Sequence, residues 1–233
     1  MTAHYRLPAQ PLPSSSTAVA APAQTNSVQA VTSLYRDGVK RVLDTLIVIV
    51  SAPVTLPLVL FLALLVMRSG GNPFYRQARV GRGGRLYTMW KLRSMVPDAD
   101  TKLEAHLASD PAARKEWDTT QKLKADPRIT PFGQFLRRSS LDELPQLWNV
   151  LRGDMSLVGP RPMMPEQAPL YPGEAYYTLR PGITGLWQIS ERNETTFADR
   201  AHYDTRYGHD ISLLTDIRIL AATFRVVLRG TGY

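Results

Sequence analysis

Cysteine is absent from the 233-residue chain. Disulfide bonds and metal centres held by thiolates are therefore excluded, and a reducing compartment suits the composition. Histidine is also scarce, and His106, His202 and His209 do not have the spacing of metal ligands. We assign these histidines structural or solvent-exposed roles.

Charge is nearly missing from residues 1–35, which hold one cation, Arg6, and no acid. Residues 1–30 are rich in Pro, Ala, Ser, Thr and Gln, a composition that buries too little surface to offset the entropy of ordering. We therefore predict a disordered N-terminal tail over residues 1–35. It does not resemble a secretory signal, because the apolar stretch begins only at Leu43 and no cleavage site follows.

The positive charge is concentrated in one segment. Residues 36–94 hold ten Lys and Arg against two acids, a net charge of +8, whereas residues 95–233 hold 17 against 18. This excess surrounds the one long apolar run, which indicates anionic lipid head groups as its partner. Since no recognisable nucleic-acid-binding module accompanies it, we expect no nucleic-acid partner.

Residues 45–67 form 23 consecutive positions without a charge. As a straight helix they measure roughly 35 Å, enough to cross a hydrocarbon core of about 30 Å. A buried helix of a soluble protein rarely carries so long an apolar run. A spanning helix and a re-entrant helix, which enters and leaves by the same face, both remain compatible with the length.

Two features favour the re-entrant helix, which we place at residues 36–69. Pro53 and Pro57 lie in the middle of the run, where each removes a backbone hydrogen bond and bends a helix. Cations flank both ends of the run, and the positive-inside rule then places both flanks in the cytoplasm. Prolines also occur in spanning helices, so the second topology stays open.

The remaining segments predict an α+β fold that is mainly helical. Residues 73–93 alternate weakly around the turn at residues 81–84, which predicts a small β-hairpin. Residues 98–124 are helical and charged, with an interruption at Pro111. The closing segment, residues 211–229, predicts an amphipathic helix that lies either in the core or at the membrane interface.

Two adjacent carboxylates stand out in residues 139–150. Ser140 and Glu143 have the spacing of a capping box, which places Asp142 and Glu143 in the first turn of a helix. Acidic residues are common there because they offset the helix dipole, so the pair has a purely structural explanation. Pro145 favours a functional explanation. It disfavours a helix directly after the pair, and such exceptions to local helix preference are often found at functional sites.

Two turns rich in Gly and Pro follow. Pro160 and Pro162 fix the backbone around Arg161, whose planar guanidinium then suits a phosphate, although an ordinary loop arginine paired with an acid fits as well. Residues 180–188 form the second turn. Its glycines either let backbone approach a ligand closely or simply make the turn.

Taken in order, these motifs resemble the bacterial sugar transferases, the monotopic phosphoglycosyl transferases that initiate exopolysaccharide and O-antigen synthesis. The resemblance covers roughly residues 36–229. The matching pieces are residues 40–44 (KRVLD), 74–81 (FYRQARVG), 91–95 (KLRSM), 141–147 (LDELPQL), 153–156 (GDMS), 158–162 (VGPRP) and 180–185 (RPGITG). One departure concerns the membrane helix, where family members bend at a Ser-Pro pair but Leu56 precedes Pro57 here.

The resemblance implies a reaction and its partners. A hexose 1-phosphate, with galactose or glucose as candidates, would pass from a UDP-sugar donor to undecaprenyl phosphate, releasing UMP in the first membrane step of exopolysaccharide biosynthesis. Mg²⁺ would be the cofactor. Residues 70–233 would form a cytoplasmic catalytic domain on the membrane surface, at the inner face of the bacterial inner membrane and in contact with its lipids. Self-association into a homo-oligomer is compatible with the sequence.

The resemblance also implies roles for particular residues. Asp142 would be the nucleophile that forms a covalent phosphosugar-aspartate. Glu143 would bind the metal, with Asp142 beside it, and would help deprotonate the lipid phosphate. Lys91, Arg137 and Arg161 match positions that hold phosphates. A different class of function, a non-catalytic membrane-anchored subunit of polysaccharide assembly, would need the two carboxylates only to cap a helix.

Overall fold

The computed structural model describes residues 34–120, 123, 125–190 and 197–228. The tail predicted for residues 1–35 lies outside this range, except that Leu34 and Tyr35 are helical. The described helices are α1 (Lys40–Met67), α2 (Ala99–Ser109), α3 (Pro111–Thr120), α4 (Pro131–Arg138), α5 (Gln146–Arg152), α6 (Ala175–Thr178), α7 (Leu186–Ile189), α8 (Arg200–Asp210) and α9 (Leu213–Leu228). Shorter π and 3₁₀ turns are η1 (Tyr35–Val39), η2 (Arg82–Gly84), η3 (Leu141–Glu143) and η4 (Pro165–Leu170).

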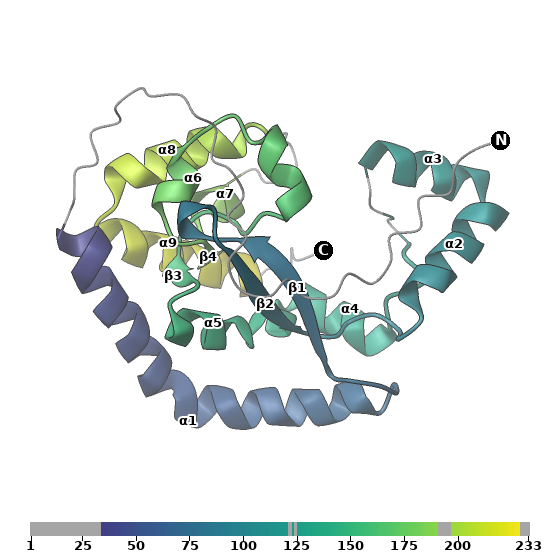
Figure 1. Cartoon of the computed structure of the whole chain (residues 1–233). Coiled ribbons are helices and arrows are strands. Elements are labelled where there is room, and N and C mark those ends of the chain that lie inside the picture. Colours follow the sequence, from purple (N-terminus) through teal and green to yellow (C-terminus); the bar gives the residue numbers. More distant parts are fainter. Residues whose placement is uncertain (1–33, 121–122, 124, 191–196, 229–233) are drawn as a thin grey trace.

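Two small sheets accompany the helices, so the predicted mainly helical α+β class is confirmed. Strands β1 (Phe74–Val80) and β2 (Leu86–Leu92) pair antiparallel, as the sequence predicts. Gly83 and Gly84 adopt positive φ angles of 69° and 77° in the turn between them, a conformation that favours glycine. Strands β3 (Ser156–Val158) and β4 (Gly182–Thr184) pair in parallel. Figure 1 shows the hairpin crossing the centre of the fold, α1 along its outside, and α2 and α3 projecting away from it.

Helix α1 contacts the rest of the domain near both of its ends. Val48 belongs to a buried cluster with side chains of β2, α5, β3, α8 and α9. Leu62, Ala63 and Val66 belong to another, with side chains of β2 and α4. The exposed apolar side chains of α1 are Val42, Leu46, Ile47, Ile49, Val50, Val54, Leu56, Leu60, Phe61, Leu64 and Met67. Among the described residues, Tyr35–Met67 is the one helical stretch long and apolar enough to cross a membrane, with a hydropathy of 2.6.

The two prolines lie inside α1 without interrupting it. The helix is continuous from Lys40 to Met67 and changes direction along its length (Figure 1). Prolines remove backbone donors, and the hydroxyls of Ser51 and Thr55 donate to the carbonyls of Val48 and Ser51, at 3.0 and 3.1 Å, which also bends helices. The structure therefore has a bent helix in place of two separate hairpin legs, and its re-entrant course in a membrane stays a prediction.

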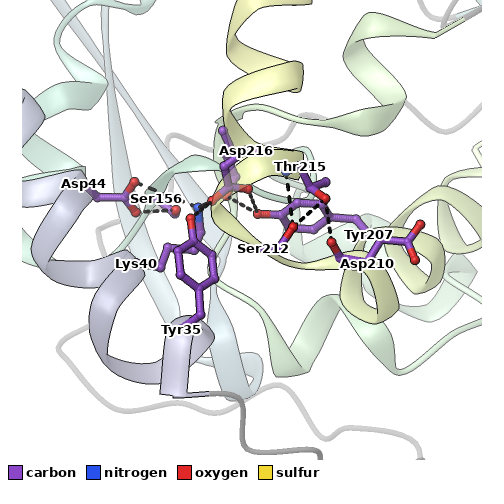
Figure 2. Close-up of polar contacts among 10 residues, drawn as sticks. Tyr35, Lys40, Asp44, Ser156, Tyr207, Asp210, Ser212, Thr215 and Asp216 are labelled. Carbon is purple, nitrogen blue, oxygen red and sulfur yellow. Dashed lines mark hydrogen bonds and ion pairs between the residues drawn. The ribbon is translucent and has the colours of Figure 1, made fainter.

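A buried polar cluster joins the start of α1 to α9 (Figure 2). Asp216 on α9 accepts hydrogen bonds from Tyr35 at 2.7 Å and from Tyr207 at 2.6 Å, and its Oδ2 lies 2.6 Å from Nζ of Lys40. Ser156 donates to Asp44, one turn further along α1, at 2.5 Å. Removing one partner of such a buried charge pair costs about 3–5 kcal/mol, so the cluster fixes where α1 leaves the domain.

The Gly-Pro turns of the sequence serve close packing between two backbone segments. A Cβ on Gly182 would lie 2.1 Å from the amide nitrogen of Gly159, and one on Gly185 would lie 2.0 Å from the Gly159 carbonyl oxygen. Only glycine allows this approach. The loop that carries Arg161 is thereby held against the turn at residues 180–188.

The predicted capping box at Ser140 and Glu143 is wrong. Ser140 has a φ of 56° and its side chain makes no capping hydrogen bond. Leu141–Glu143 forms a separate 3₁₀ turn, and α5 begins only at Gln146. The physical reason is Pro145, which has no N–H to donate to Leu141 and so prevents one continuous helix.

The other predicted helices agree with the structure. Asp110 separates α2 from α3 and its carboxylate accepts from the amides of Ala112 and Ala113, so the interruption predicted at Pro111 is confirmed. Helix α9 has one side in the core, and its place at the membrane interface stays a prediction. Ile219 is buried in the core, whereas Phe224 and the apolar residues at its start are exposed.

Candidate active site

Asp142 lies in the 3₁₀ turn between α4 and α5, against strand β2. Asn149 joins α5 to β2. Its side-chain amide donates to the Thr88 carbonyl at 2.7 Å and accepts from the Trp90 backbone amide at 3.1 Å. Asn149 is fully buried, so these bonds are costly to break. Strand β2 therefore fixes the position of the turn that carries the two carboxylates.

Lys91 of β2 contacts both carboxylates. Its Nζ lies 2.7 Å from Oε1 of Glu143 and 4.0 Å from Oδ2 of Asp142. Arg137 is held nearby because its Nε donates to Oγ of Ser94 at 2.8 Å. Gly133 allows α4 to approach Ser94 this closely, since a Cβ at position 133 would lie 1.9 Å from the Ser94 carbonyl oxygen.

The residues assigned from the sequence share one cavity of about 860 Å³. Asp142, Glu143, Lys91, Arg137 and Arg161 all line it. Among the described residues, Arg161 makes no ion pair with an acid, and its guanidinium lies 5.7 Å from the ring centroid of Trp187. No acid within the described ranges therefore acts as the nearby partner that the structural alternative for Arg161 requires. Pro53 and Pro57 lie in α1 and do not line this cavity.

Burial dominates the electrostatics of Asp142, whose residue is only 8% exposed. Loss of hydration raises the pKa of its carboxyl to about 6, against the opposing charge of Lys91, while Glu143 raises the pKa further. Arg137 acts with Lys91 to favour the ionised form. An incompletely hydrated carboxylate facing two cations is a chemically competent nucleophile.

The carboxylates of Asp142 and Glu143 also offer oxygen ligands to a metal. Across the described ranges, no three His, Asp or Glu side chains gather into a complete metal cage. Two neighbouring carboxylates still suit Mg²⁺, which commonly keeps several waters and takes other ligands from substrate phosphates. The donor set at this end of the cavity therefore fits Mg²⁺.

Comparison with known proteins decides the family. The model described as bacterial sugar transferase matches residues 35–230. The chain belongs to the bacterial sugar transferase family.

Three relatives illustrate the range of this family. The UDP-galactose-lipid carrier transferase of Erwinia amylovora is 47% identical over 195 residues, which cover 83% of this chain and 41% of the relative. The undecaprenyl-phosphate galactose phosphotransferase of Salmonella typhimurium gives the same values. The exopolysaccharide production protein ExoY of Sinorhizobium fredii is 41% identical over 222 residues, 94% of this chain and 96% of the relative. This bacterial sugar transferase thus spans about two fifths of the first two relatives and nearly all of the third.

The cavity of this bacterial sugar transferase contains polar residues that the sequence did not single out. Tyr75, Gln77 and Arg79 line it together, and their alternation along β1 is a period-2 signal that predicts one shared face. Gln188 lines it as well. No local pattern identifies Gln188, because it reaches the cavity only through the packing of residues 182–185 against Gly159.

Proposed function

We propose that the protein transfers a hexose 1-phosphate from a UDP-sugar to undecaprenyl phosphate, with release of UMP, as the first membrane step of exopolysaccharide biosynthesis. The observation that carries this proposal is the buried Asp142 beside Lys91, in a cavity that Arg137 and Arg161 also line. A relative in Xanthomonas campestris, 40% identical over 209 residues covering 83% of this chain and 40% of the relative, is a UDP-glucose:undecaprenyl-phosphate glucose-1-phosphate transferase. Galactose and glucose are therefore the first sugars to test.

In the first half-reaction, a carboxylate oxygen of Asp142 attacks the β-phosphorus of the donor. The bond from that phosphorus to the bridging oxygen breaks, and UMP leaves with the electron pair. The product is an acyl phosphate, a mixed anhydride between the Asp142 carboxylate and the sugar phosphate. Lys91, Arg137 and Arg161 offset the negative charge that gathers during attack on a diphosphate.

In the second half-reaction, an oxygen of the lipid phosphate attacks the same phosphorus and Asp142 leaves as a carboxylate. Glu143 accepts the proton if the lipid phosphate arrives protonated, since it lies beside Asp142 on the same turn. Asp142 and Glu143 are the residues that would hold Mg²⁺. When bound, this ion neutralises phosphate charge near the reacting phosphorus.

An apolar groove beside the cavity supports a lipid acceptor. It has a volume of about 360 Å³ and lies between α1, the β-hairpin and α5. Leu144 and Leu147 line both the groove and the polar cavity, so the two spaces adjoin. A lipid phosphate can therefore place its head beside Asp142 and the start of its chain along α1.

The contacts of α1 support a re-entrant course at the cytoplasmic face of the inner membrane. A straight helix of 28 residues would be about 42 Å long. Lys40, at one end, pairs with Asp216 of the domain, and Val66, near the other end, packs on the same domain. A spanning helix would place one of these ends across a hydrocarbon core of about 30 Å from the domain. The exposed apolar side chains between them, with residues 70–233 outside the bilayer, fit insertion into one leaflet.

A non-catalytic assembly subunit gains no support from the structure. That alternative requires the two carboxylates to cap a helix, but the cap at Ser140 is absent and Asp142 is buried in a cavity beside a lysine. Burial of a carboxylate removes its hydration, a cost that capping a helix does not require.

Release of UMP tests the proposal directly. Purified protein in detergent is incubated with undecaprenyl phosphate, Mg²⁺ and either UDP-galactose or UDP-glucose, and UMP is measured. We expect Asp142→Asn and Glu143→Gln each to lower turnover below about one thousandth of wild type, because each removes a reacting group. Asp110→Asn, which keeps the cap of α3, should leave turnover unchanged.

Turnover near wild type in Asp142→Asn would exclude Asp142 as the nucleophile. Intact-mass analysis of wild type trapped with donor alone should show a phosphohexose adduct, and Asp142→Asn should show none. Absence of UMP release with every nucleotide sugar in a panel would favour the non-catalytic alternative.

A further inference from the structure

The active-site cavity has one region that the proposed chemistry does not use. Ile183 of β4 and Gln188 and Ile189 of α7 form one part of its wall, and Thr223 and Val227 of α9 form another. We call this region the Gln188 end. Its wall is mostly apolar and contains one primary amide.

Both polar atoms of the Gln188 side chain lack a hydrogen-bond partner in the part of the chain that the structure describes. The residue is 8% exposed, so water does not readily compensate. The other polar side chains at this end are satisfied, because the hydroxyls of Thr184 and Thr223 bond each other at 2.6 Å. Buried amides in native proteins nearly always have partners, so an orphan amide that lines a cavity indicates a ligand.

Gly185 makes room for this amide. A Cβ at Gly185 would lie 2.8 Å from Oε1 of Gln188. Any other residue there would push the amide away from its place. The orientation of Gln188 therefore depends on the same turn that packs against Gly159.

Positive charge lies near the Gln188 end. Arg79 and Arg161 form no ion pair with an acid among the described residues, and the guanidinium of Arg161 lies 5.7 Å from the ring centroid of Trp187, the residue before Gln188. Arg79 and Arg161 also line the cavity, and Nε of Arg79 is buried without a partner. A group of like charges of this kind is stabilised by an anion.

We infer that the Gln188 end holds the nucleoside monophosphate half of the donor, with the Gln188 amide hydrogen-bonded to the base and the arginines facing its phosphate. A primary amide offers one donor and one acceptor side by side, which complements the adjacent N–H and carbonyl of uracil. The apolar wall suits the faces of a planar base. This inference rests on the proposed function, because in-line attack by Asp142 expels the nucleotide on the far side of the phosphorus.

The test compares UMP with ribose 5-phosphate, which carries the same phosphate but no base. Both are titrated calorimetrically into the full-length protein in detergent. In Gln188→Met, which keeps the length of the side chain, we expect the Kd for UMP to rise about tenfold through the loss of two hydrogen bonds. The Kd for ribose 5-phosphate should not change. The melting temperature should not fall, since the substitution removes buried polar atoms that have no partner.

Gln134→Met is the matched control, because Gln134 is exposed on α4 and does not line the cavity. It should change neither Kd. Gln188→Asn, which keeps the amide but shortens its reach, should lose UMP affinity as Gln188→Met does, and it serves if the methionine variant folds poorly.

Unchanged UMP affinity in both Gln188 variants would overturn the inference and leave sugar-phosphate transfer standing. So would a wild-type protein that binds UMP no more tightly than ribose 5-phosphate. A wild-type protein that binds neither UMP nor UDP would instead contradict the proposed reaction itself.

Discussion

Asp142 is poorly hydrated, yet neighbouring cations favour the ionised form of its carboxyl. Burial raises the pKa of its carboxyl, while Lys91 and Arg137 favour the charged form. A carboxylate in water is a weak nucleophile, and partial dehydration in a fixed position makes it a better one. The arrangement also keeps the two cations close to the place where phosphate charge would accumulate.

Asp204 on α8 is a second buried carboxyl, and it lies outside the cavity wall. It is 5% exposed and accepts a hydrogen bond from Tyr171 at 2.8 Å. Burial raises the pKa of Asp204 to about 7, against the opposing effects of the Tyr171 hydrogen bond and the charge of Arg200. Its titration therefore affects stability in a range of pH that is easy to measure.

We predict that Asp204 makes the protein less stable as pH rises from about 4 to about 7. In this range the folded state keeps a proton that the unfolded state has already released, so unfolding becomes easier as protons become scarce. The shift of about three pKa units sets an upper limit of about 4 kcal/mol on the effect. Asp204→Asn should flatten this dependence, measured by denaturant unfolding at pH 5 and pH 8.

Asp210→Asn is the control for this prediction, because Asp210 lies on the same helix with an exposed carboxylate. It should leave the pH dependence as in wild type. Equal slopes in Asp204→Asn and wild type would mean that Asp204 does not keep its proton in the folded state.

At the scale of elements, α1 and α5 build the apolar groove between them. Val48, Ala52, Thr55 and Val59 of α1 line one side, at roughly helical spacing. The other side is lined by Leu144, Pro145, Leu147, Trp148 and Leu151. The bend in α1 matters here, because it lets one helix contact the domain near both ends and still leave a groove in the middle.

We predict that Ala52→Trp fills the groove and weakens use of undecaprenyl phosphate. The KM for this acceptor should rise about tenfold, which corresponds to lost burial of about two methylene groups. Formation of the Asp142 adduct from donor alone should not change, because that step does not involve the lipid. Steady-state kinetics and intact-mass analysis measure the two effects separately.

Val50→Trp provides the comparison, since Val50 is exposed on the same helix and does not line the groove. It should leave the KM unchanged. If Ala52→Trp raises the KM no more than Val50→Trp, the lipid chain binds elsewhere.

At the scale of the whole molecule, α1 and the domain act as one unit. The Lys40–Asp216 pair fixes the start of the helix (Figure 2), and the cluster around Val66 fixes its end. The side chains at its middle are apolar and exposed. Under the proposed re-entrant course, this distribution would bring the polar cavity close to the level of a lipid phosphate.

The absence of native cysteine allows a direct test of this placement. We predict that single cysteines at Gly38 and Ser69, on the two flanks of α1, are both labelled by a membrane-impermeant maleimide only after the inner membrane is opened. A cysteine at exposed Val54, in the middle of the helix, should be protected by lipid in both conditions. Labelling of either flank in intact spheroplasts would show that α1 spans the membrane.

Local patterns determined much of the fold. The β-hairpin, the break at Pro111 and the apolar helix follow from interactions between residues a few positions apart, so composition and spacing suffice to predict them. The predicted capping box was wrong for a related reason. The Ser140–Glu143 spacing fits the motif, but Pro145 lacks the N–H that would continue the helix.

The sequence by itself determined the elements, the charge around the membrane helix and the motif order that identifies the family. Only the tertiary structure decided that Asp142 is buried beside Lys91, 51 positions earlier in the chain, and that Gln188 reaches the same cavity without a partner. Burial and unmet hydrogen bonds depend on contacts between distant segments. No pattern among neighbouring residues can specify them.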